Sequence, residues 1–159
     1  MIKITGIILI SSAISACGAY LSAKITQRKK FRKALFELLL YIKTCIENGN
    51  LPLNRIYENF YDSDAEKYGF LTVLRKSGLK DALISVKDEL PEELYELYLS
   101  FSESAGKSLY SSSESALCAR YVELIKEKEK KIAEKEAVKQ LLFRRLGILC
   151  GLLAALLLI

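Results

Sequence analysis

The chain has 159 residues and a formal net charge of +5, with four Cys and no His. Without His it lacks the usual general base near neutral pH and any Ser-His or Cys-His nucleophile pair. The four Cys are scattered and form no C-x-x-C pair of the kind found in zinc sites. We therefore expect a protein of about one domain that is not an enzyme and holds no metal or cofactor.

The first long element is an uncharged stretch over 4–23, which as a helix would extend about 30 Å, the thickness of a bilayer core. Six basic residues follow within 24–33, whereas only Lys3 precedes it. Because basic flanks stay in the cytoplasm, this asymmetry predicts a transmembrane anchor over 1–23. The alternative is a lipoprotein signal with an exported helical domain, since small residues precede Cys17.

The next segments carry helical patterns. Within 31–48, apolar residues recur at spacings of three and four; they are Leu35, Leu38, Leu39, Ile42 and Ile46. Gly49 predicts the end of this helix, and Pro52 predicts the first turn of another. Asp62 to Asp64 reads as a turn and cap, followed by a helix over 65–77 that ends at Gly78.

The second half of the middle region is also helical. A short helix is expected over 80–88, and Pro91 opens another that ends near Gly106. A last helix over 115–146 has neither Gly nor Pro, and its predicted apolar positions are Leu117, Tyr121, Leu124, Ile125 and Ile132. No alternating β pattern of useful length is present. We predict an all-α bundle of about five or six helices over 24–145.

The C-terminal run, residues 146–159, is uncharged and follows Arg144 and Arg145. As a helix it covers about 21 Å, which snorkelling arginines could extend. We predict a second anchor here, and hence a multi-pass membrane protein with a cytoplasmic main domain. The residues assigned to setting this topology are Arg28, Lys29, Lys30, Arg144 and Arg145.

Two further features bear on function. Gly106-Lys107-Ser108 resembles the end of a phosphate-binding loop, but Phe101 stands where the motif needs its first glycine, and a helix precedes it instead of a strand. A nucleotide-dependent regulator is therefore only an alternative. Glu47 lies near a helix C-terminus, where an acid is unfavourable against the dipole, so it should have a partner such as Arg55 or a backbone amide.

Three short segments resemble the stage III sporulation protein AB family of endospore-forming bacteria. The stretch from Glu47 to Leu53 is similar to the family's E-x-G-x-x-P-L segment. Gly106-Lys107-Ser108-Leu109 is similar to its G-K-T-L-G segment, although Tyr110 replaces the second glycine. Arg145-Leu146-Gly147 leads into the leucine-rich C-terminus, and the likeness covers essentially the whole chain.

The resemblance implies a helical bundle similar to the cytoplasmic domain of the type II secretion F component. It also implies a non-enzymatic membrane platform or adaptor of the sporulation channel between mother cell and forespore, required for endospore formation. The implied partners are other proteins of that complex, including a secretion-type ATPase on the mother-cell side, and no nucleic acid or small-molecule substrate. The implied interaction residues are Glu47, Gly49, Pro52, Leu53, Gly106, Lys107 and Leu109.

Overall fold

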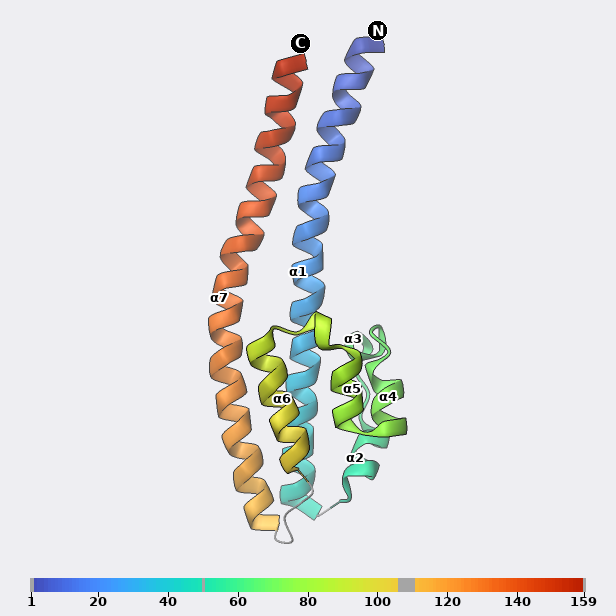
Figure 1. Ribbon diagram of the computed structural model, residues 1–159, viewed down its shortest axis with the longest axis vertical. Helices are drawn as coiled ribbons and strands as arrows, with labels where there is room; N and C mark the ends of the chain where they lie inside the picture. Colours follow the sequence, from blue (N-terminus) through green and yellow to red (C-terminus); the bar gives the residue numbers. More distant parts are fainter. Residues whose placement is uncertain (1, 50, 106–110, 159) are drawn as a thin grey trace. The chain divides into compact units, whose positions relative to one another are not determined.

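The computed structural model describes residues 2–49, 51–105 and 111–158, and every regular element in these ranges is helical. The predicted all-α class is confirmed. Two long helices, α1 (Ile2–Gly49) and α7 (Ser111–Leu158), come first and last in the chain (Figure 1). Between them lie α2 (Leu53–Asn59), α3 (Ser63–Glu66), α4 (Phe70–Ser77), α5 (Leu79–Ser85), the 3-10 helix η1 (Lys87–Glu89) and α6 (Glu92–Ser104).

The chain divides into two compact units. Unit 1 consists of residues 1–27 and 132–159, and unit 2 of residues 28–131. Unit 1 therefore contains the first part of α1 and the last part of α7, whereas unit 2 contains the remainder of both helices and all the shorter ones.

Within unit 1, α1 and α7 approach each other through glycines. A Cβ atom added to Gly18 would lie 2.8 Å from the Phe143 carbonyl oxygen and 3.0 Å from the Gly147 Cα. The side-chain amide of Gln140 also donates a hydrogen bond of 2.9 Å to the Thr26 hydroxyl. Because glycine has no side chain, the two backbones come into direct contact here.

The predicted membrane anchors are wrong. Within the described residues, neither long helix contains a stretch that is both long and apolar enough to cross a membrane. The N-terminal prediction depended on length and absence of charge alone. The C-terminal run extends only about 21 Å, against the roughly 30 Å of a bilayer core. The predictions of anchors over 1–23 and 146–159 and of a multi-pass membrane location are therefore corrected.

Unit 2 has a conventional hydrophobic core, to which α1 contributes most. The whole stripe predicted within 31–48 is buried, together with Phe31 and Ala34. From α6 the buried residues are Leu94, Tyr98 and Phe101. The Phe101 ring meets the Tyr121 ring of α7 edge to face, with 5.5 Å between centroids. Three helices that are far apart in sequence therefore share one core.

The phase predicted for the last helix is partly wrong. Between residues 115 and 146 its buried residues are Cys118, Val122 and Ile125, of which only Ile125 was predicted. Leu124 is exposed, and Leu117, Tyr121 and Ile132 are half-buried. The buried face is therefore turned by about one residue from the predicted one.

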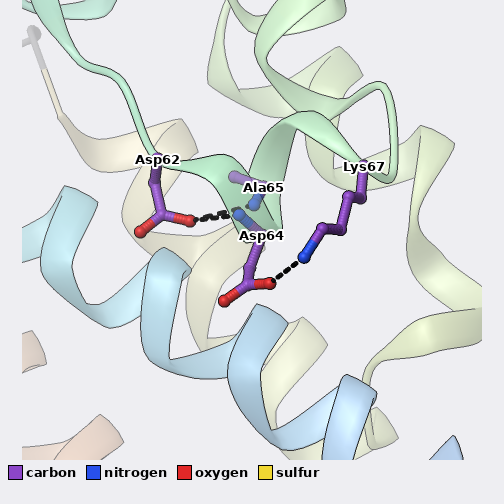
Figure 2. Close-up of polar contacts among 4 residues, drawn as sticks. All are labelled: Asp62, Asp64, Ala65 and Lys67. Carbon is purple, nitrogen blue, oxygen red and sulfur yellow. Dashed lines mark hydrogen bonds and ion pairs between the residues drawn. The ribbon is translucent and has the colours of Figure 1, made fainter.

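The short helices owe their ends to particular residues. The Asp62 carboxylate accepts hydrogen bonds from the backbone N–H groups of Asp64 (2.8 Å) and Ala65 (3.0 Å), as Figure 2 shows. This N-cap begins α3. The helix predicted over 65–77 is instead two helices, because Gly69 adopts a left-handed φ of 68° between them. The helix predicted over 80–88 is α5 followed by η1.

Candidate functional site

The first predicted motif forms the connection between α1 and α2. Glu47 lies in the last turn of α1, and Gly49 is its final residue. Pro52 occupies the N-cap position of α2 with extended backbone (φ −63°, ψ 141°), and Leu53 is the first helical residue. The Pro52 carbonyl accepts the first two backbone bonds of α2, from Arg55 (2.9 Å) and Ile56 (3.2 Å). Proline fits here because its fixed φ suits a helix start.

The second predicted motif, comprising Gly106, Lys107 and Leu109, lies outside the described residues. Its neighbours are placed: Ala105 is the C-cap of α6, and Ser111 is the first residue of α7. The interaction role assigned to these three residues and the phosphate-loop alternative both stay predictions.

One contact places the described start of α7 beside the first motif. The Ser115 hydroxyl, in the second turn of α7, donates a hydrogen bond of 2.9 Å to the Glu47 carboxylate. Lys43 lies 3.7 Å from the same carboxylate oxygen. The expected partner of Glu47 is thus Ser115 with Lys43, whereas Arg55 pairs with Glu58 at 3.7 Å. The described start of α7 therefore lies beside the end of α1, at the same end of unit 2 as the connection to α2.

This end of unit 2 exposes apolar surface. We call Glu47, Leu51 and Pro52 the connection surface; Leu51 has 46% of its surface accessible, and the other two are also exposed. Immediately behind it, Ile56 and Tyr57 are buried in the core. Burial raises the pKa of Tyr57 to about 12, with a smaller electrostatic contribution from Cys118. The connection surface therefore offers a partner protein an apolar side chain and a carboxylate, and the helix that follows it is anchored in the core by Ile56 and Tyr57.

The sequence did not reveal an ion pair elsewhere in unit 2 in which Arg32 is buried and the Glu129 side chain keeps 21% of its surface accessible. Arg32 has only 1% of its surface accessible, and its Nε donates to both oxygens of Glu129, at 2.8 and 3.1 Å. The hydroxyl of Tyr98 is buried nearby without a hydrogen-bond partner among the described residues. Burial raises the pKa of Tyr98, and the charge of Glu129 adds to the effect while Arg32 opposes it.

A sequence signal for this pair exists in retrospect. Arg32 stands three residues before Leu35 and seven before Leu39, so it shares their helical face. It was instead grouped with the surrounding basic residues. Its partner is 97 residues away and sits in a run of Lys and Glu, which hides it.

The basic residues assigned to setting topology have other surroundings. Arg28 donates to the Glu89 carboxylate at 2.8 Å and to the Asp88 carbonyl at 3.0 Å, which connects α1 with η1. Lys29 and Lys30 are exposed, as are Arg144 and Arg145 on α7. With the anchors overturned, the topological role given to these five residues has no support.

The four cysteines are thiols; Cys17 and Cys150 lie in unit 1, and Cys45 and Cys118 in unit 2. No group of three or more Cys, Asp or Glu that could hold a metal ion occurs within the described ranges.

Comparison with known proteins gives a family. The chain matches the family described as stage III sporulation protein AB over residues 3–159. No curated protein and no solved structure matches the chain. The family match covers nearly the full length, from the start of α1 through the end of α7. The chain therefore belongs to the stage III sporulation protein AB family.

Proposed function

We propose that this protein is a non-enzymatic adaptor of the sporulation channel complex between mother cell and forespore, and that endospore formation requires it. Membership of the stage III sporulation protein AB family supports a role in sporulation with other sporulation proteins. The finer role, docking a secretion-type ATPase or ring subunits, is our inference from the character of the exposed surface.

The observation that carries the proposal is the hydrogen bond between Ser115 and Glu47. It joins the end of α1 to the start of α7 and so supports the α1–α2 connection, where Leu51 and Pro52 are exposed. The exposed Leu51 and Pro52 offer an apolar contact to a partner, and the Glu47 carboxylate beside them offers a hydrogen-bond acceptor. The partner docks its own apolar side chain against Leu51 and places a hydrogen-bond donor near Glu47.

The direct test replaces Leu51 by Asp in a sporulating strain. We expect the variant protein to accumulate normally, heat-resistant spores to fall by at least tenfold, and capture of the ATPase by the purified chain to be lost. Ile84→Asp is the matched control, because Ile84 is similarly exposed (51%) but lies on α5.

Three outcomes would contradict the proposal. Normal sporulation in a deletion strain would remove the requirement. Equal spore loss in the Leu51→Asp and Ile84→Asp strains would show that the effect is not specific to the connection surface. Normal ATPase capture by Leu51→Asp, despite spore loss, would assign the surface to another partner.

A further inference from the structure

The part of α7 that belongs to unit 1 exposes a regular row of leucines. Each has 49–75% of its surface accessible, and the row consists of Leu142, Leu146, Leu149, Leu153 and Leu156. They alternate between spacings of four and three residues, which is an average repeat of 3.5. This repeat keeps all five on one narrow face of the helix, which we call the leucine face. It extends about 21 Å along α7.

The leucine face lies on the side of α7 that is turned away from α1. Gly147 is the residue in contact with α1, since a Cβ atom added to it would lie 3.1 Å from the Gly18 Cα. Leu149 follows Gly147 by two residues, which turns it by about 200° around the helix. The packing of α1 against α7 therefore uses the glycine side of α7 and leaves the leucine face accessible.

The repeat and the chemistry of this face fit a second helix of the same kind. Leucines at a 3.5-residue repeat are the side chains that interlock, knob into hole, between paired helices. Within 137–158 the only charged residues are Lys139, Arg144 and Arg145, so the segment carries no acid that would select a basic partner. The matching partner is an apolar helix face of equal length and repeat, and a second copy of this chain supplies one.

The basic residues also select the orientation of such a pair. If the two α7 helices ran parallel, Arg144 and Arg145 of each copy would lie beside the same residues of the other, and like charges repel. Antiparallel helices move these residues apart along the contact. In that arrangement Leu142 of one copy lies close to Leu156 of the other, and leucines pair along the face.

We propose that the leucine face joins two copies of this chain in an antiparallel dimer through their α7 helices. The proposal goes beyond the adaptor function and does not depend on it, because the leucine face belongs to unit 1 whereas the connection surface belongs to unit 2.

The size of the contact predicts that the dimer dissociates on dilution. Full burial of one such side chain removes roughly 60–120 Å² of apolar surface from water. Val138 and Leu152 flank the row and are 62% and 59% exposed. Pairing these seven side chains from each copy would bury roughly 500–1,000 Å² in total. This is less than the ~1,600 Å² of a standard stable interface and is typical of a weak complex.

Sedimentation equilibrium of the full chain over a concentration series measures this association. We expect the average mass to rise from that of one chain toward that of two. Leu149→Asp places an unpaired carboxylate in the middle of the face and should weaken association at least about tenfold. The matched control is Ile148→Asp, because Ile148 is 52% exposed but is turned by about 100° from Leu149. The control should change association by no more than about twofold.

Two further measurements accompany this series. Circular dichroism should show that both Asp variants are as helical as the parent, because they alter exposed positions. Leu51→Asp, which tests the connection surface, should dimerise like the parent. The dimer and the adaptor function can therefore fail separately.

The orientation is measured by cross-linking in a chain whose four native cysteines are replaced by Ala and that dimerises like the parent. Leu142→Cys and Leu156→Cys are introduced separately, and one of the two chains carries a tag. The two positions are about 21 Å apart along the helix. In a mixture of the two variants, a short bismaleimide should link the tagged chain to the untagged one. It should link neither variant to itself.

Each other result overturns the proposal. A chain that stays monomeric at every concentration would assign the leucine face to a different protein or to lipid. Equal weakening by Leu149→Asp and Ile148→Asp would show general apolar association instead of a specific face. Masses that rise beyond two chains would contradict a closed dimer. Cross-links within each variant, in place of cross-links between the two, would contradict the antiparallel arrangement.

Discussion

In unit 1, α1 meets α7 at two glycines, whereas in unit 2 the same two helices contribute buried side chains to a hydrophobic core. The buried residues described in unit 1 are Gly18 and Gly151. Unit 2 buries aromatic and branched aliphatic residues instead, among them Phe31, Phe70 and Phe101. The difference predicts opposite sensitivities: unit 1 tolerates no added atom at its contact, and unit 2 tolerates no removed one.

The largest effect is expected in the core of unit 2. Phe101→Ala removes a fully buried ring and its contact with Tyr121, so it should lower the free energy of unfolding by about 3–5 kcal/mol. Chemical denaturation of the full chain would measure this loss. Tyr61→Ala, at a side chain that is 70% exposed, should change stability by no more than about 0.5 kcal/mol. Similar losses of stability in Phe101→Ala and Tyr61→Ala would contradict the expected sensitivity of the buried core.

A pH titration sharpens the comparison, because the affected tyrosines lie in unit 2. Tyr57 loses its proton near pH 10 when unfolded but near pH 12 when folded. The unfolded state therefore binds fewer protons between these values, and stability should fall by roughly 2–3 kcal/mol as pH rises through this window. Tyr57→Phe should flatten the fall but not abolish it, because the pKa of Tyr98 is also raised. If the dependence of stability on pH were unchanged in Tyr57→Phe, the loss of stability could not be assigned to the raised pKa of Tyr57.

The matching test of unit 1 adds a single carbon. Gly18→Ala places a Cβ 2.8 Å from the Phe143 carbonyl oxygen, so α1 and α7 must separate, at a cost of about 1–3 kcal/mol. Amide hydrogen exchange should accelerate in 2–27 and 132–158 and stay unchanged in the core of unit 2. Ala16→Leu adds more volume at an exposed position of the same helix and should have no such effect.

A smaller effect is expected at the edge of unit 2. Asp62→Ala removes the N-cap of α3 and should cost about 1 kcal/mol. Its neighbour Asp64 makes an exposed ion pair with Lys67 at 2.7 Å, and Asp64→Ala should cost less because exposed pairs contribute little. Thermal unfolding of the two variants would compare them; a larger loss for Asp64→Ala contradicts the capping assignment.

The sequence predicted buried residues best where the apolar spacing within a single helix defines one face. The stripe from Leu35 to Ile46 is buried as predicted, because its spacing already defines a face. For α7 the spacing was ambiguous, and the structure buries Cys118 and Val122 while it leaves Leu124 exposed. The break at Gly69 was missed because apolar spacing continues across it.

The candidate site was predictable to a similar degree. The α1–α2 connection follows from Gly49 and Pro52, which are local signals. Its proximity to the start of α7 depends on the contact of Glu47 with Ser115, 68 residues away, which no local pattern contains. The burial of Arg32 was hidden for the same reason. The membrane anchors were predicted from uncharged stretches alone. Within the described residues, neither long helix is long and apolar enough to cross a membrane.

The separation between Arg32 and Glu129 also has a consequence in time. The arginine is synthesised 97 residues before its partner, which at about 5–20 residues per second is a delay of roughly 5–20 s. During this delay α2 to α6 can form from nearby contacts, while the face of α1 that receives α7 stays open. We expect nascent chains stalled before residue 129 to be cleaved readily by protease within α1, and chains stalled well beyond it to resist. The last helix thus completes a core that the first helix leaves unfinished.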